Sequence, residues 1–209
     1  MSTEPIHREP PPDLRSRPLP LVTLAGPWFR AYRLANDPLY FGHRATERFD
    51  DPAKDYGVCY VGDSVTCAFI ETLPAIVDLP GRAVLGVYRT ALHERGWARV
   101  DLGDVGAPLR LVDLTGPGLA RLTADADLCS CPAYAVPQRW SRALHDHPES
   151  PDGLLYRARH DPSLRSLALF DDRVAGRIAM VPQGSWAEQP NLATLRDIRR
   201  RYGLRILPG

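Results

Sequence analysis

YGVCYVGDSVTCAFIETL, residues 56–73, is the stretch that decides the fold. Its first seven residues are rich in β-branched and aromatic side chains and predict a buried strand. A Gly-Asp pair ends that strand, and Ser64 is a favourable N-cap for the short helix that follows. Glu71 falls near the end of this helix, where the helix dipole does not favour an anion. We therefore expect Glu71 to be either a solvated surface carboxylate or a functional one.

The composition indicates one globular core. The chain has 209 residues, 44% of them hydrophobic, which favours a single domain. A net charge of +1 provides no global field for nucleic acid or for an acidic membrane. Lys54 is the only lysine among 26 Lys and Arg residues, so almost every cation is a planar arginine fork suited to phosphate.

The N-terminal residues and the cysteines indicate the cellular compartment. Residues 1–20 are proline-rich and predict a tail or an extended arm outside the core, which leaves one domain over residues 21–209. No apolar run approaches the roughly 18 residues of a membrane span, and the N-terminus lacks the apolar segment of a secretory signal. The four cysteines are irregularly spaced and do not form a zinc pattern. We expect a cytoplasmic protein with reduced thiols, no metal and no membrane contact.

Strand patterns outnumber helical patterns and do not alternate regularly with them, which favours an α+β fold over a doubly wound sheet. A polar loop, FGHRATERFDDPAKD, occupies residues 41–55 and has a length that is often functional. Besides the central stretch, the predicted strands are 28–34, 82–89, 109–114, 153–159, 166–170 and 204–207, and the predicted helices are 118–124, 137–147 and 191–202. Asn191 is the expected cap of the last helix and Gly203 its stop.

The residues suited to phosphate and sugar chemistry are dispersed along the chain. The sequence contains no glycine-rich nucleotide loop, no H-E-x-x-H and no G-x-S-x-G. Arg30 lies on the first expected strand, and Arg48 lies in the polar loop. Tyr60 ends the central strand, eleven residues before Glu71. Residues 153–163 add Tyr156, Arg157, Arg159, His160 and Ser163.

These phrases together resemble the RES-domain family, which is named for an Arg, a Glu and a Ser. The matching phrases cover about residues 27–172, and their combination is specific although each phrase alone is weak. They are WFRAYR (28–33), RFDDP (48–52), the central stretch (56–73), LRLVDLTG (109–116), DGLLYRARHD (152–161) and LALF (167–170).

The resemblance implies a fold similar to the ADP-ribosyltransferase toxins, a compact split β-core with surrounding helices. It implies a toxin of a toxin–antitoxin pair, commonly encoded with an antitoxin of the helix-turn-helix Xre type. Such toxins consume NAD as a substrate, either by phosphorolysis, with inorganic phosphate as co-substrate, or by ADP-ribosyl transfer to a protein. No direct nucleic-acid contact is expected, and the acceptor, the antitoxin and homo-oligomerisation stay open.

The resemblance also assigns residues. Arg30 matches the first motif arginine, and the catalytic set is Glu71, Arg48 and Tyr60. The family phrase Tyr-x-Ser-Arg reads Tyr-Arg-Ala-Arg here, so Ala158 replaces the motif serine. Either Ser163 or His160 supplies the lost group, or activity is weaker, or the acceptor differs. The residues expected to bind NAD are Arg30, Tyr32, Tyr156, Arg159 and His160.

General chemistry supports these residue types. Cleavage of the nicotinamide–ribose bond passes through an oxocarbenium-like state, which a carboxylate such as Glu71 stabilises. Arginine forks bind pyrophosphate bidentately, and an aromatic ring such as that of Tyr60 stacks on nicotinamide or ribose. We expect Arg30, Arg48, Tyr60 and Glu71 to converge on one cleft.

Three alternatives stay open. Arg48 could simply pair with Asp50 or Asp51, an interaction worth little at a surface. The chain could be a non-catalytic module that binds a nucleotide or a partner after loss of the serine. The arginine-rich residues 195–205 could form a nucleic-acid helix or a partner surface, although no aromatic stacking platform lies beside them.

Overall fold

The central stretch forms strand β3 (Val58–Gly62) and helix α1 (Val65–Ile70), in the order that the sequence predicted. The Ser64 hydroxyl oxygen accepts a hydrogen bond from the backbone N–H of Cys67 at 3.0 Å, which confirms the predicted N-cap. Glu71 is the C-cap residue of α1 and lies half-buried.

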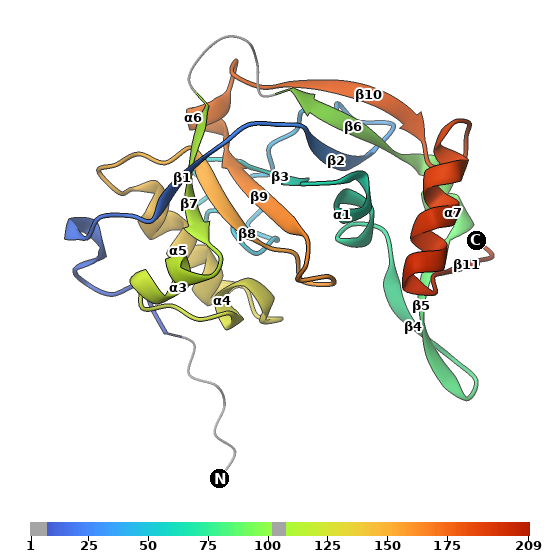
Figure 1. The fold of residues 1–209 in the computed structure, drawn as a ribbon, viewed down its shortest axis with the longest axis horizontal. Helices are drawn as coiled ribbons and strands as arrows, with labels where there is room; N and C mark the ends of the chain where they lie inside the picture. The colour runs from blue at the N-terminus through green and yellow to red at the C-terminus, as the bar shows by residue number, and fades with distance from the viewer. Residues whose placement is uncertain (1–7, 102–107) are drawn as a thin grey trace. The chain divides into compact units, whose positions relative to one another are not determined.

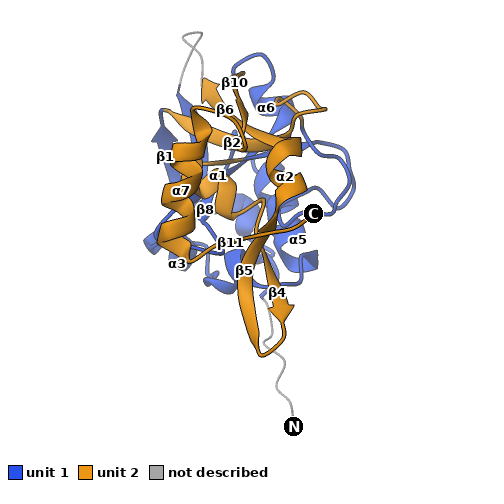
Figure 2. Cartoon of the chain, turned by 90° about the vertical axis from the view of Figure 1, so that its right-hand side faces the viewer, with its two compact units in different colours: residues 1–25, 41–60, 102–178 blue, residues 26–40, 61–101, 179–209 orange. Residues whose placement is uncertain are grey.

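The structure, a computed structural model, describes residues 8–101 and 108–209. The chain groups into two units, coloured separately in Figure 2. Unit 1 comprises residues 1–25, 41–60 and 102–178, and unit 2 comprises residues 26–40, 61–101 and 179–209. The chain passes from unit 1 to unit 2 within β3, after Tyr60. The sequence predicted one domain over residues 21–209, and that domain count stays a prediction.

Unit 1 is built on strands that lie side by side in the order β1-β7-β8-β9 (Figure 1). β7 and β8 are parallel, whereas β1 pairs with β7, and β9 with β8, in antiparallel register. The elements are a short 3-10 helix (Leu14–Ser16), β1 (Leu21–Leu24), β7 (Leu109–Leu114), α3 (Pro117–Arg121), α4 (Asp127–Ser130), α5 (Ala135–His145), β8 (Gly153–Arg157), β9 (Arg165–Phe170) and α6 (Asp171–Val174).

The core of unit 1 includes part of the chain that the sequence assigned to a tail. Leu14 is 3% exposed and Leu19 is 5% exposed, and both belong to the same buried cluster as Phe49 and Trp140. The expectation that residues 1–20 stay outside the core is therefore wrong for this part, because two leucines between the prolines supply apolar area to bury. Residues 1–7 lie outside the described residues.

Unit 2 contains two groups of strands. β2 (Trp28–Arg33), β6 (Arg95–Asp101) and β10 (Ala179–Ser185) are antiparallel neighbours in that order. In the second group, β5 (Arg82–Tyr88) lies between antiparallel β4 (Ala75–Leu79) and parallel β11 (Arg205–Leu207). Helices α2 (Arg89–Glu94) and α7 (Asn191–Tyr202) complete the unit, whose core includes Phe69, Trp186, Leu195 and Ile198.

One predicted capping role is wrong. Asn191 is the first residue of α7 and does not cap it. Its amide donates to the carbonyl oxygens of Gln183 and Ser185, both at 2.8 Å, and accepts from the Trp97 indole at 2.9 Å. Gly203 ends α7 with a φ of 61°, as predicted. Within the part of the chain that the structure describes, no helix has both the length and the apolar character needed to cross a membrane.

Candidate functional site

The predicted site residues are distributed between the two units. Unit 2 holds Arg30, Tyr32 and Glu71, and unit 1 holds the others, namely Arg48, Tyr60, Tyr156, Arg159 and His160. The expected convergence of Arg30, Arg48, Tyr60 and Glu71 on one cleft joins residues of both units and stays a prediction.

Arg48 is a buried cation that is held without a carboxylate. It is 7% exposed, and its Nη1 donates to the Cys131 carbonyl oxygen at 2.7 Å and lies 3.6 Å from the Cys131 sulfur. Its guanidinium carbon lies 4.9 Å from the ring centroid of Tyr134. Across residues 8–101 and 108–209, Arg48 forms no ion pair with an acidic side chain. The alternative pairing with Asp50 or Asp51 is therefore wrong, and the charge of Arg48 is not neutralised inside the described chain.

Asp50 and Tyr60 fix the backbone on which Arg48 lies. The Tyr60 hydroxyl donates to Asp50 Oδ1 at 2.9 Å and accepts from the backbone N–H of Phe49 at 2.9 Å. Asp50 is 2% exposed, and its other carboxylate oxygen accepts from the backbone N–H groups of Thr46 and Glu47, each at 3.0 Å. Because these bonds bracket residue 48, they set the direction in which its side chain leaves the loop.

The environment of Tyr60 limits what its hydroxyl can do. Burial first, and then the neighbouring carboxylate of Asp50, raise the pKa of Tyr60 well above its ordinary value. A hydroxyl that stays protonated and is engaged on both sides suits a positioning role better than proton transfer. The predicted stacking of its ring on a substrate is a separate matter and stays a prediction.

Two further contacts support the loop. Gln138 on α5 donates from Nε2 to the carbonyl oxygens of Ala45, at 3.0 Å, and Glu47, at 2.9 Å. Tyr156 on β8 is 7% exposed, and its ring meets that of Phe49 edge-on at a centroid distance of 4.9 Å. Tyr156 thus packs behind the loop. Sequence reasoning assigned no role to Gln138 or Cys131, and it named Asp50, part of the RFDD phrase, only as a possible ion-pair partner of Arg48.

The segment that follows β8 carries the altered motif. Ala158 is 1% exposed, and its backbone N–H donates to the Leu164 carbonyl oxygen at 3.1 Å. Arg159 and His160 are exposed. The Ser163 hydroxyl donates to Asp161 Oδ1 at 2.6 Å and its backbone N–H to the same atom at 3.1 Å. Ser163 thus closes a local turn, which speaks against it as the source of the hydroxyl that Ala158 lacks.

The residues of unit 2 are placed by strand β2 and helix α1. Arg30 donates from Nη1 to the Tyr40 carbonyl oxygen at 2.6 Å. Tyr32 lies two residues further on the same strand face and is buried, and burial first, then Asp37, raise its pKa. The backbone N–H of Glu71 donates to the Cys67 carbonyl oxygen at 3.1 Å at the end of α1. In the described residues, no group of three or more His, Cys, Asp or Glu is placed to hold a metal ion.

Comparison with known proteins identifies relatives. The family model for the RES domain matches residues 27–190. The probable toxin y4kH of Sinorhizobium fredii (strain NBRC 101917 / NGR234) is 35% identical over 68 residues, 32% of this chain and 53% of that protein. The chain thus matches about half the length of this relative. A chain in the crystal structure of the M. tuberculosis MbcT–MbcA toxin–antitoxin complex is 16% identical, with a TM-score of 0.57 over 86% of this chain and 92% of that chain. This likeness confirms the predicted α+β, ADP-ribosyltransferase-like fold.

Proposed function

This chain belongs to the RES domain family, and on that premise we propose that it is the toxin of a toxin–antitoxin pair that cleaves the nicotinamide–ribose bond of NAD. The observation that carries the proposal is the buried guanidinium of Arg48, which is held by a carbonyl oxygen and an aromatic face and has no acidic partner in the described chain. A cation placed in this way is suited to an anionic ligand such as a pyrophosphate.

The proposed roles follow from the residue types. Arg48 and Arg30 bind the pyrophosphate of NAD, and Tyr32, Tyr156, Arg159 and His160 contribute to the binding surface. Glu71 holds a ribose hydroxyl and stabilises the positive charge that develops on the ribose. Tyr60 positions the Arg48 loop through its hydroxyl, and its ring stacks on the nicotinamide or ribose. Each role concerns an organic substrate, and no metal is required.

The bond changes are those of a glycosyl transfer. The bond between the nicotinamide nitrogen and the ribose carbon breaks, and its electron pair leaves with neutral nicotinamide. An acceptor oxygen then bonds to the same ribose carbon and loses its proton to solvent or to a base. With inorganic phosphate as acceptor the reaction is phosphorolysis, and with a protein acceptor it is ADP-ribosyl transfer.

The names of the relatives support the biological part of the proposal. One relative is called a probable toxin, and one structural neighbour comes from a toxin–antitoxin complex. We propose an antitoxin of the Xre type as the protein partner and the cytoplasm as the location, where NAD is available.

Proton NMR of NAD mixed with the purified protein tests the activity. Free nicotinamide should accumulate, and faster with inorganic phosphate if the reaction is phosphorolysis. Arg48→Gln should slow the reaction, whereas Arg139→Gln, which alters an exposed arginine on α5, should not. An unchanged NAD spectrum after hours at micromolar protein would exclude the enzymatic function.

A non-catalytic NAD-binding module is the second candidate, and the observation in its favour is the altered serine motif. Ala158 offers no hydroxyl, and Ser163 is bonded to Asp161. Calorimetric titration with NAD separates the two candidates, because a binding module gives a heat of binding without release of nicotinamide.

A further inference from the structure

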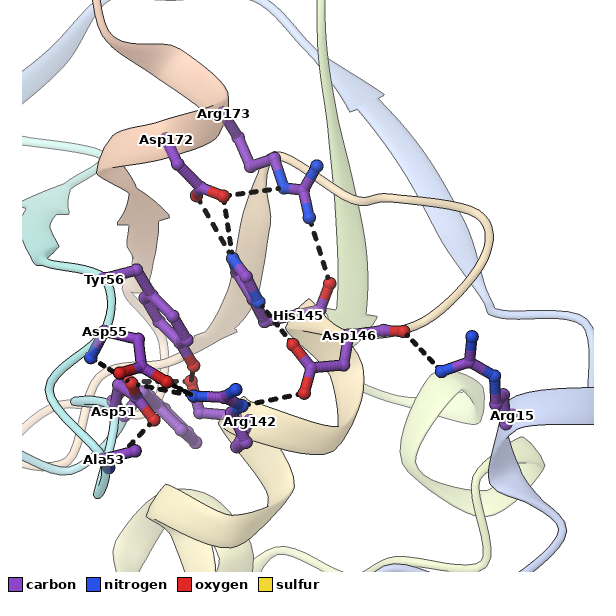
Figure 3. Close-up of polar contacts among 12 residues, drawn as sticks. Arg15, Asp51, Ala53, Asp55, Tyr56, Arg142, His145, Asp146, Asp172 and Arg173 are labelled. Atoms are coloured by element: carbon purple, nitrogen blue, oxygen red, sulfur yellow. Dashed lines mark hydrogen bonds and ion pairs between the residues drawn. The ribbon is translucent and has the colours of Figure 1, made fainter.

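Arg142 on α5 binds several carboxylates at once (Figure 3). Its Nη1 donates to Asp51 Oδ2 at 3.1 Å and to Asp55 Oδ2 at 2.7 Å, and its Nε donates to Asp146 Oδ2 at 2.7 Å. The side chain of Asp51 is fully buried, at 0% exposure, while that of Asp55 is 64% exposed. A single guanidinium therefore joins helix α5 to the loop that directly follows Arg48.

Asp51 also binds the backbone of the loop. Its carboxylate accepts from the backbone N–H groups of Ala53 at 3.2 Å and Asp55 at 2.7 Å, which closes the turn after Arg48. Asp146, the other partner of Arg142, is itself oriented by His145, whose Nδ1 lies 2.9 Å from Asp146 Oδ1. The Arg142 guanidinium is thus held by carboxylates of the loop, Asp51 and Asp55, and by Asp146 at the end of its own helix.

A second contact holds the same loop on the same helix. The hydroxyl of Ser141, next to Arg142, donates to the Phe49 carbonyl oxygen at 2.7 Å and lies 3.2 Å from the Tyr56 hydroxyl. Residues 46–56, which we call the Arg48 segment, contain no helix or strand, so these side-chain contacts replace the backbone ladder that would fix a regular element.

We propose that Arg142 is a positioning residue that locks the Arg48 segment onto α5 and so keeps the Arg48 guanidinium on Cys131 and Tyr134. Loss of Arg142 leaves the buried carboxylate of Asp51 with backbone donors only, which is costly for a charge removed from water. The segment then opens more often, and Arg48 leaves its place. The consequence for catalysis rests on the proposed function, whereas the opening of the segment does not.

The chain supplies its own reporter of this opening. Lys54 is the only lysine, it is exposed, and it lies within the Arg48 segment. An endoproteinase specific for lysine therefore cuts the native chain at one place, and only when the segment opens enough to enter the protease. When opening is fast relative to cleavage, the rate reports the equilibrium population of the open form.

Arg142→Gln should raise the cleavage rate at Lys54 by about tenfold or more, since charge-assisted bonds to a buried carboxylate are lost. Arg139→Gln is the matched control, because Arg139 lies one turn earlier on α5 and pairs with the exposed Glu9 outside the segment. Its rate should stay within about twofold of the unmodified protein. Equal rates for Arg142→Gln and the unmodified chain, or equal acceleration in both variants, would overturn the proposal.

A third variant distinguishes cleavage after global unfolding from cleavage after local opening of the Arg48 segment. Ile198→Val removes one methylene from the core of unit 2, and it gives the cleavage that general destabilisation alone produces. At matched free energy of unfolding, Arg142→Gln must still cleave faster, or the lock is not local. Asp55→Asn keeps the test open if Arg142→Gln does not fold, since Asp55 is exposed. For each protein, the cleavage rate of the native chain is divided by the cleavage rate of the same chain unfolded in urea, which removes any effect of residue 55 on the protease itself. This ratio should be a few-fold higher for Asp55→Asn than for the unmodified protein, and an unchanged ratio contradicts the proposal.

A second experiment measures NAD consumption in variants of Arg142 and Arg48, alone and combined. If Arg142 acts through Arg48, Arg142→Gln raises KM for NAD more than it lowers kcat, and Arg48→Gln costs less in that background than in the unmodified chain. Strictly additive effects would overturn the link to Arg48. If the unmodified protein does not consume NAD, the proposed function fails, while the cleavage experiment still decides the role of Arg142.

Discussion

Glu71 and Arg48 are both assigned to the proposed site, but the chain places them in opposite ways. Glu71 ends helix α1, and two hydrogen bonds that shape this helix are local: the Ser64 hydroxyl accepts from the Cys67 N–H, and the Glu71 N–H donates to the Cys67 carbonyl oxygen. Arg48 lies in a segment without regular structure and binds Cys131, 83 residues away. A site residue can therefore be positioned by neighbours in the sequence or by partners that only folding brings close.

The difference predicts how each placement fails. A local unit tolerates the loss of one contact because its backbone bonds remain. The Arg48 segment has few backbone bonds of its own, so each side-chain contact carries a larger share of its order.

The largest effect tests the chemistry at the locally placed residue. Glu71→Gln removes a negative charge opposite a cationic transition state, so NAD consumption should fall about a hundredfold. Nicotinamide release followed by NMR measures it, with Glu94→Gln, an exposed carboxylate of α2, as the control. Undiminished turnover in Glu71→Gln would remove this residue from the site.

The second effect tests the side-chain contacts that order the Arg48 segment. Asp50→Asn puts an N–H donor against groups that are themselves donors, the backbone N–H groups of Thr46 and Glu47 or the hydroxyl of Tyr60. The free energy of unfolding should fall by about 2 kcal/mol. Chemical denaturation measures the loss, and Asp197→Asn on the exposed face of α7 should change little. A loss no greater than this control would mean that Asp50 does not hold the loop.

A smaller effect is expected at the local unit. Ser64→Ala deletes the side-chain cap of α1 but leaves the helix bonds in place, so the unfolding free energy should fall by about 1 kcal/mol. Ser64→Gly should recover most of it. If Ser64→Ala costs more than Asp50→Asn in the same denaturation experiment, the contrast between the two placements is not valid.

The smallest effect concerns acid stability beside the Arg48 segment. Burial by itself raises the pKa of Asp146, but hydrogen bonds from His145 and Arg142 outweigh it and hold this pKa below its ordinary value of 3.8. The lowered pKa means that Asp146 stabilises the folded state above pH 3.8, and that this contribution is lost as the pH falls further. Asp146→Asn should therefore flatten the stability curve slightly between about pH 5 and 2. Melting curves across that range would contradict this if the two proteins kept parallel slopes.

Sequence patterns located the regular elements with strong local signals. β7 and α7 occupy the predicted residues, and α1 follows its predicted cap. Strands β1, β4, β6 and β10 were missed. β10 has a proline and a register shift, and β4 exposes Ile76 at 75%.

The sequence by itself determined the family, the strand–turn–helix unit with Glu71, and the identity of the arginines suited to phosphate. Only the tertiary structure decided what holds Arg48, why Asp51 is buried beneath Arg142, and that Leu14 and Leu19 join the core. The physical reason is the range of the interactions. A helix cap and the apolar face of a helix involve residues a few positions apart, so both leave a pattern in the sequence. A hydrogen bond between residues 80 or 90 positions apart leaves no such pattern.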